Sequence, residues 1–285
     1  MTAEFEIVPN LSEGRDLAVV AACAAAMEAA GARVVDRTSD PIHHRSVITA
    51  VGSASDVVAA AVALAATARE RIDLRRHRGE HPRIGALDVL PFVPLGTATL
   101  DDAVALAHRA ANRIWSELGI PSYLYGAAAS GADRARLAAI RRGGFEGLAA
   151  RSAADERWRF DYGDAVHPSA GAIAIGARPF LIAFNVELNS PDLALARRIA
   201  RTLRGSSGGL RTLQCLGLRL AGDRVQVSCN ITDVDAVPLY RVTELVRRAA
   251  ARAGVTVGRS ELIGLAPRRA VERTARAYEA AVPRR

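Results

Sequence analysis

The feature that most restricts the fold of this chain is one order of secondary structure that occurs twice. In each half, helical and alternating apolar periodicities predict strand, helix, strand, strand, helix and strand. In the first half the predicted ranges are 4–8, 12–30, 33–37, 45–52, 54–72 and 86–93. In the second half they are 180–188, 190–204, 213–220, 224–231, 238–253 and 260–265. Two copies of this split β-α-β order predict an α/β (α+β) chain of two ferredoxin-like βαββαβ subdomains.

The boundary between the two copies is predicted near residue 177. The first copy is followed by a predicted helix (100–118) and strand (122–125), and a last helix is predicted from Pro267. Residues 150–178 differ from both copies, because they are first charged and then rich in small residues around Pro168. A plain linker is the commoner reading of such a stretch, and a ligand-holding loop is the other. We expect subdomains at 1–177 and 178–285.

The charge of the chain excludes several kinds of chemistry. The formal net charge is +8, and every positive side chain is arginine because the sequence has no lysine. Schiff-base and P-loop chemistry, which need lysine, are therefore excluded, whereas arginine forks suit carboxylates. Aromatic residues are only 5% of the chain, which disfavours an RNA-binding module that stacks bases on a sheet.

The cysteines and the length of the apolar segments indicate where in the cell the protein is expected. The cysteines Cys23, Cys215 and Cys229 lie in apolar segments without metal-like spacing, so we expect buried thiols in a reducing cytoplasm and no metal site. No apolar stretch reaches the roughly 18 residues of a membrane span, so we expect no membrane association.

The segment from Ile72 to Val89 holds the densest group of chemically active side chains. It places His77, Glu80, His81 and Arg83 close together, with Gly79 and Pro82 shaping the backbone. A histidine beside a glutamate has the groups for proton transfer near neutral pH, whereas helical metal ligation is disfavoured through glycine and proline. A solvated basic loop is the alternative interpretation.

This segment and seven others resemble the formiminotransferase family, the folate-dependent enzymes of histidine breakdown. The segment is RHRGEHPRIGALDV (76–89), and the others follow the family's order along nearly the whole chain. They are VPNLSEGR (8–15), RSVITAVG (45–52), PSYLYG (121–126), GGFEGL (143–148), GARPFLIAFNVEL (176–188), VQVSCNITD (225–233) and SELIGLAP (260–267).

The resemblance implies an enzyme with two ferredoxin-like halves and a ligand groove between their sheets. The implied activity is glutamate formimidoyltransferase, which moves a formimino group between N-formimino-L-glutamate and tetrahydrofolate, the co-substrate, in histidine degradation. The family's catalytic histidine falls on His81, with His77 the weaker candidate. Glu80, ahead of Asp36 and Asp40, is the carboxylate expected beside the cationic amidine. No metal is required.

The resemblance also implies binding residues and small-molecule partners. Because both substrates are anionic, Arg45, Arg83 and Arg178 in or beside the motifs are expected to bind carboxylates. Asn10 in an apolar strand is a further substrate-binding candidate. The folate-binding stretch is expected at Asp164, Ala165, Val166, His167, Pro168, Ser169, Ala170, Gly171 and Ala172. No nucleic-acid partner is expected, and a homodimer is a possible assembly.

Two positions depart from the family pattern. A glutamate usually follows YLYG, where this chain has Ala127, and an asparagine commonly precedes RSVIT, where it has His44. The missing carboxylate leaves open a folate-dependent formyl or formimino transferase with another acceptor. A non-catalytic folate-binding protein on the same scaffold is a separate alternative, and the intact GEHPR segment argues against it.

Overall fold

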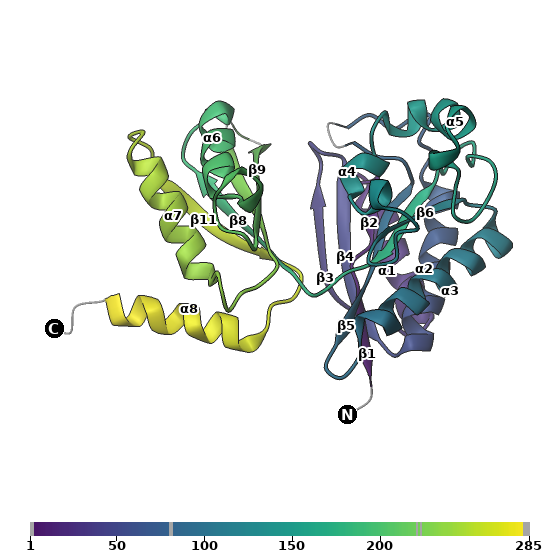
Figure 1. Cartoon of the computed structure of the whole chain (residues 1–285), viewed down its shortest axis with the longest axis horizontal. Coiled ribbons are helices and arrows are strands. Elements are labelled where there is room, and N and C mark those ends of the chain that lie inside the picture. Colours follow the sequence, from purple (N-terminus) through teal and green to yellow (C-terminus); the bar gives the residue numbers. More distant parts are fainter. Residues whose placement is uncertain (1–2, 80–81, 221, 223, 282–285) are drawn as a thin grey trace. The chain divides into compact units, whose positions relative to one another are not determined.

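The computed structural model describes residues 3–79, 82–220, 222 and 224–281. It divides into two compact units, Met1–Phe180 and Leu181–Arg285, both labelled by element in Figure 1. Within the described residues, no helix combines the length and the apolar character needed to cross a membrane.

The first unit begins with the predicted βαββαβ order, and its antiparallel pairing is ferredoxin-like. Its elements are β1 (Glu4–Ile7), β2 (Asn10–Leu11), α1 (Leu17–Ala29), β3 (Arg33–Asp40), β4 (Arg45–Gly52), α2 (Ala54–Arg71) and β5 (Leu87–Leu95). The first strand, divided into β1 and β2, lies between β4 and β5, and β3 pairs with the other edge of β4. The predicted ferredoxin-like class is thus confirmed for this unit.

Two parallel strands extend this sheet, and one of them was not predicted. After α3 (Leu100–Leu118) the chain forms β6 (Ser122–Gly126), and much later β7 (Ile173–Ala177) inserts between β5 and β6. All five residues of β7 are buried. Such a strand lacks polar alternation, so periodicity does not separate it from the loop-like stretch before it.

The segment between β6 and β7 contains helices, although no element was predicted for residues 127–149 and only a charged stretch and a loop for residues 150–172. It contains η1 (Ala132–Arg134), α4 (Leu137–Ile140), α5 (Gly144–Ala154) and η2 (Glu156–Trp158). Ile140 and Leu148 from its helices pack with Tyr123 and Val89 of the sheet. Tyr123, fully buried, also donates its hydroxyl hydrogen to the Trp158 carbonyl at 2.6 Å. The segment therefore covers part of the sheet face opposite α1–α3.

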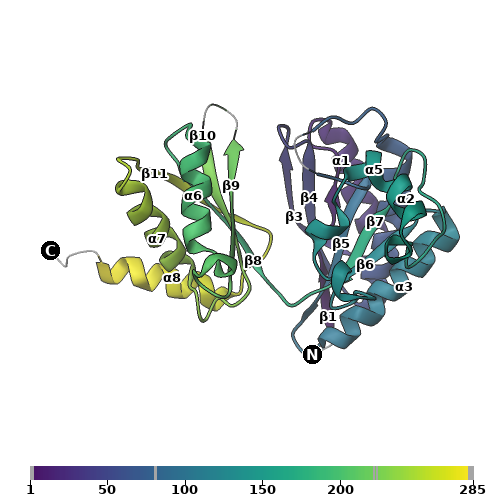
Figure 2. The same cartoon turned by 45° about the horizontal axis from the view of Figure 1, so that its top comes forward.

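The second unit repeats the ferredoxin-like order with an added C-terminal helix. Its elements are β8 (Ile182–Leu188), α6 (Leu193–Leu203), η3 (Gly205–Ser207), β9 (Leu213–Leu220), β10 (Arg224–Ile231), α7 (Leu239–Ala251), β11 (Val257–Ile263) and α8 (Arg268–Ala281). The antiparallel strand order is β11-β8-β10-β9, and Figure 2 shows α6 and α7 beside this sheet. Strands β9 and β10 lie at the predicted ranges 213–220 and 224–231 and pair as an antiparallel hairpin, while Asp223 between them lies outside the described residues.

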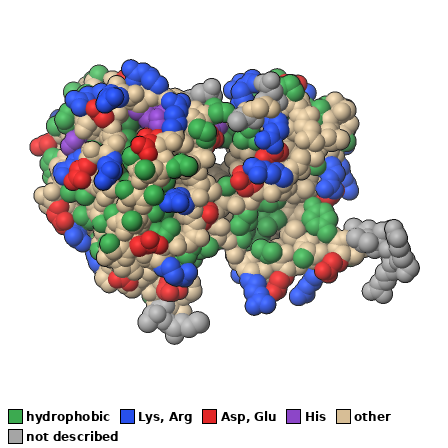
Figure 3. Space-filling model, turned by 180° about the vertical axis from the view of Figure 1, so that it is seen from behind, with side chains coloured by type: hydrophobic (Ala, Val, Ile, Leu, Met, Phe, Trp, Pro, Cys, Tyr) green, Lys and Arg blue, Asp and Glu red, His purple; other side chains and the backbone are tan. Residues whose placement is uncertain are grey.

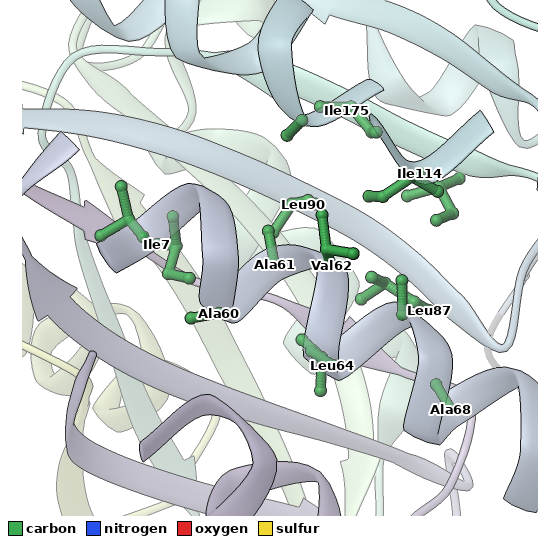
Figure 4. Close-up of a cluster of buried hydrophobic side chains, with 14 of the residues drawn as sticks. Ile7, Ala60, Ala61, Val62, Leu64, Ala68, Leu87, Leu90, Ile114 and Ile175 are labelled. Atoms are coloured by element: carbon green, nitrogen blue, oxygen red, sulfur yellow. The ribbon is translucent and has the colours of Figure 1, made fainter. Parts of the chain in front are cut away.

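The core of the first unit lies between the sheet and its three long helices. Ile7 and Leu90 from the strands meet Ala61 and Leu64 of α2 (Figure 4). Helix α2 is capped by Ser53, whose hydroxyl accepts a hydrogen bond from the Asp56 N–H. Helix α1 begins later than predicted, since its cap is Asp16 and Ser12 is buried in a turn.

All three cysteines are buried free thiols, as expected from their apolar surroundings. Cys215 and Cys229 face each other across β9 and β10, with their sulfur atoms 3.1 Å apart.

Candidate functional site

Three of the family-like segments converge on one recess in the first unit. We call it the histidine recess. Its lining residues are Leu11, Ser12, His43, His44, Arg45, His77, Arg83 and Asp88. They come from β2 and the turn after it, the β3–β4 loop and the start of β4, the α2–β5 connection, and the start of β5. Segments far apart in the sequence thus supply one small group of imidazole, guanidinium and carboxylate side chains.

His77 is held in the recess by hydrogen bonds at both ring nitrogens. Its Nδ1 accepts from the Arg83 Nε at 2.9 Å, and its Nε2 lies 3.1 Å from the His44 carbonyl oxygen. An arginine can only donate and a carbonyl can only accept, so the proton of His77 belongs on Nε2. Burial lowers the pKa of His77, and the nearby charge of Arg83 lowers it further. This imidazole is therefore neutral at pH 7.

Arg83 connects the recess to helix α5. Its two terminal nitrogens donate to the two carboxylate oxygens of Glu146, at 3.0 and 2.8 Å. The Arg83 side chain is 11% exposed, whereas Glu146 is 62% exposed. A substrate carboxylate at Arg83 would have to compete with this bidentate pair. Glu146 belongs to the GGFEGL segment, but nothing in the sequence pointed to this contact.

His44 occupies a backbone conformation that few side chains adopt. Its φ is +50°, the region that glycine and asparagine enter most readily. The Gly14 N–H donates to both the His44 Nδ1 (3.1 Å) and the Glu13 carboxylate (2.9 Å). Burial lowers the pKa of His44, although the charge of Glu13 opposes the shift. The departure from the family's asparagine thus falls where backbone geometry itself favours asparagine.

Asp88 is aimed at the recess by an irregularity in β5. Asn10 pairs with Val89 but Leu11 pairs with Leu87, so Asp88 is an extra residue in the ladder. Its carboxylate accepts from the Ile84 N–H at 2.8 Å and from the Nε and a terminal nitrogen of Arg141. Asp88 is 2% exposed. Neither Asp88 nor Arg141 was among the residues predicted from the sequence.

Arg45 lines the same recess at the start of β4. It pairs across the ladder with Asp40, whose carboxylate accepts from the Nδ1 of His43 at 2.6 Å. Burial lowers the pKa of Arg45 to about 10, and the neighbouring charge of Arg141 adds to the shift. Arg45 therefore stays cationic at pH 7 in a partly buried site, which suits an anionic ligand.

The two predicted catalytic residues, Glu80 and His81, lie outside the described residues. Gly79, just before them, packs against the His43–His44 backbone, because a Cβ there would lie 2.7 Å from the His43 carbonyl oxygen. Arg83, which follows them in the sequence, donates a hydrogen bond to His77.

The predicted folate-binding stretch runs beside the same α2–β5 connection. Ala172 N–H donates to the Ile84 carbonyl, and Ala86 N–H donates to the Ala170 carbonyl, both at 2.9 Å. Ala170, Gly171 and Ala172 are buried, while Asp164, Ala165 and Pro168 are exposed. Val166, His167 and Ser169 are half-buried.

The remaining predicted residues lie elsewhere in the first unit. Asn10 donates to the Val8 carbonyl at 2.8 Å and is 7% exposed. Arg178 follows β7 and lies near Glu6, which pairs with Val51. Arg45 is the first residue of β4, and Val51 lies near the other end of that strand. At about 3.3 Å per residue, the two positions are about 20 Å apart. The structure therefore does not bring Arg178 together with Arg45.

The candidate carboxylate Asp36 and the departure from the family pattern at Ala127 lie outside the recess lining. Asp36 pairs with Thr49 across the β3–β4 ladder, and Ala127 is an exposed turn residue. Among the described residues there is no group of three or more His, Cys, Asp or Glu side chains placed to hold a metal ion.

Glu6 is a buried carboxyl that the sequence analysis did not single out. It is 3% exposed on β1, and burial raises its pKa to about 7, with the charge of Arg178 offsetting part of the rise. In an unfolded chain this group ionises near its ordinary pKa of 4.5. The native state therefore loses stability as pH rises from 4.5 to 7, and above 7 the loss is constant.

We therefore expect Glu6→Gln to be more stable than the wild type at pH 8. The expected gain is about 3 to 4 kcal/mol, since the pKa of Glu6 rises from 4.5 to about 7 and each pKa unit corresponds to about 1.4 kcal/mol. The gain should shrink below pH 7 and vanish near pH 4.5. Urea unfolding followed by tryptophan fluorescence measures it, because both tryptophans, Trp115 and Trp158, lie in the first unit. A gain that does not change with pH would contradict this account.

Comparisons with known proteins agree with the resemblance. The model of the formiminotransferase domain, N-terminal subdomain, matches residues 4–178, and that of the formiminotransferase domain matches residues 183–281. A glutamate formimidoyltransferase of Streptococcus pyogenes serotype M1 is 42% identical over 98% of this chain and 94% of its own length. One from Thermoplasma acidophilum is 44% identical, over 96% and 91%. The formimidoyltransferase-cyclodeaminase of Sus scrofa is 40% identical over 95% of this chain and 51% of that protein.

Both halves are matched in order and the two glutamate formimidoyltransferases align over nearly their full lengths, so this chain belongs to the formiminotransferase family.

Proposed function

We propose that this protein is a glutamate formimidoyltransferase, which transfers the formimino group between N-formimino-L-glutamate and tetrahydrofolate in histidine degradation. The observation that carries the proposal is the convergence of three family segments on the histidine recess, in a chain whose relatives bear this name. The protein is accordingly a transferase that acts on small molecules.

The reaction requires a group that moves protons between nitrogen atoms. A folate nitrogen adds to the amidine carbon and must lose a proton, and the departing glutamate nitrogen must gain one. We assign this role to His81, with Glu80 as the adjacent carboxylate. Support comes from His77, whose two ring nitrogens are both occupied by hydrogen bonds. His77 would have to break one of these bonds to exchange a proton, so it remains the weaker candidate.

The substrate-binding residues are assigned by charge and place. Arg45 and Arg83 line the recess, and we propose that they bind a carboxylate of the substrates, with Asn10 and Arg178 as further binding residues. Tetrahydrofolate is assigned to residues 164–172, whose backbone pairs with the connection that carries the catalytic segment. The functional subdomains are taken as 1–177 and 178–285.

A cytoplasmic location and a homodimer stay predictions. The three free thiols are consistent with a reducing compartment. On the face shown in Figure 3, arginine side chains alternate with acidic ones rather than forming a continuous basic surface. That distribution does not favour a nucleic-acid partner.

The test is turnover by the purified full chain. Tetrahydrofolate and N-formimino-L-glutamate are supplied together, and 5-formiminotetrahydrofolate and glutamate are both quantified. A second reaction contains N-formylglutamate as the one-carbon donor. Turnover with the formimino donor supports the proposal, and turnover with the formyl donor alone replaces it with a formyltransferase. Tetrahydrofolate binding without turnover would identify a binding protein.

A further inference from the structure

A chain of contacts joins helix α5 to the β3–β4 loop through the histidine recess. Glu146 holds Arg83 by two hydrogen bonds, Arg83 donates to His77 Nδ1, and His77 Nε2 faces the His44 carbonyl. The rings of His77 and His44 also lie against each other, with centroids 4.3 Å apart. We propose that Glu146 is a positioning residue, which acts through Arg83 to hold His77 as its Nε2–H tautomer and to fix both ends of segment 77–83.

The geometry explains why Glu146 is needed in addition to Arg83. A guanidinium group is planar, so a carboxylate that engages both terminal nitrogens sets the direction of the third nitrogen, Nε. In this structure that direction meets His77 Nδ1 at 2.9 Å. A glutamine at position 146 has one acceptor oxygen instead of two, so it cannot reproduce the fork. Nε would then no longer be aimed at the imidazole.

The tautomer matters because it decides whether His77 can donate a hydrogen bond to the β3–β4 loop. With the proton on Nε2, His77 donates to the His44 carbonyl, and with the proton on Nδ1 that oxygen would face a lone pair. Gly79 packs on the same loop, since an added Cβ would lie 2.8 Å from the His44 Cβ. His77 and Gly79 thus pack against residues 43–44, and Arg83 is hydrogen-bonded to His77.

The consequence for activity rests on the proposed function, because segment 77–83 contains His81. Glu146 itself does not line the recess, so we do not assign it contact with substrate. Its loss should reduce the rate of the chemical step. Misplacement of a reacting group by about 1 Å can cost about 100-fold. We therefore expect Glu146→Gln to lower kcat by about 10- to 100-fold.

The direct test is the imidazole ¹⁵N spectrum of His77 in the full-length protein. Histidine is labelled with ¹⁵N, and His77 is assigned by its loss in His77→Gln. In the wild type, Nδ1 should resonate as the unprotonated nitrogen. In Glu146→Gln, the two nitrogen shifts should move toward each other as both tautomers become populated. Glu146→Asp, which keeps the carboxylate, should restore part of the wild-type pattern and of kcat.

A matched control is Glu117→Gln on α3. Glu117 also engages an arginine, Arg113, through two hydrogen bonds, but both side chains are exposed and neither lines the recess. It should change neither the His77 signals nor kcat. Unchanged His77 signals in Glu146→Gln would overturn the proposal, and so would altered signals with an unchanged kcat.

A failure of the proposed function can be distinguished from a failure of the proposed role of Glu146. If the wild type has no formimidoyltransferase activity, the proposed function fails, whereas the ¹⁵N spectra still decide whether Glu146 sets the state of His77.

Discussion

His81→Ala is expected to lower kcat by about 100- to 10,000-fold, the range typical of the loss of a general acid–base group. KM for both substrates should change little, because the proposed role concerns proton transfer and not binding. Neighbouring His77 cannot substitute without giving up a hydrogen bond to Arg83 or to His44. Steady-state turnover with N-formimino-L-glutamate and tetrahydrofolate measures both constants.

His108→Ala is the control for a histidine substitution as such. His108 is exposed on α3 and contacts the Tyr162 hydroxyl, so its loss should leave kcat near the wild-type value. His77→Ala serves as the competing assignment. If His77→Ala abolishes turnover while His81→Ala retains it, the proton-transfer role belongs to His77 and our assignment is wrong.

Asp88→Ala is expected to destabilise the first unit by about 3 kcal/mol at pH 7, because removing one partner of a buried ion pair leaves the other charge uncompensated. Asp88 is 2% exposed, and the Arg141 side chain is 11% exposed. The same substitution also removes the acceptor of the Ile84 N–H. Urea unfolding followed by tryptophan fluorescence gives the change in the free energy of unfolding.

A double-mutant cycle separates the ion pair from other effects of the substitution. In Asp88→Ala with Arg141→Met, the uncompensated charge is gone, so much of the lost stability should return. If the double variant is destabilised by the sum of the two single variants, the two side chains do not interact. The energetic account of Asp88 would then be withdrawn.

The repeated order of strands and helices was readable from the sequence because it depends on local periodicity. Most elements of the two ferredoxin-like units match their predicted ranges within a few residues, and the β9 and β10 ranges match at both ends. Strand β7 and the helices between β6 and β7 were not recognised. Their apolar residues are buried by elements that are distant in the sequence. Burial of this kind does not produce the local alternation of apolar and polar residues from which strands are predicted.

The sequence by itself determined the family, the fold class and the segments that contain the reactive groups, because motif order and hydrophobic periodicity are properties of the sequence alone. Only the tertiary structure decided that Arg83 is bonded to Glu146, that both nitrogens of His77 are occupied, and that Asp88 points at Arg141. These contacts join residues from about 30 to more than 60 positions apart, with the exception of the short Arg83–His77 pair. Whether a side chain is engaged or available depends on partners that packing brings together, and one sequence does not state them.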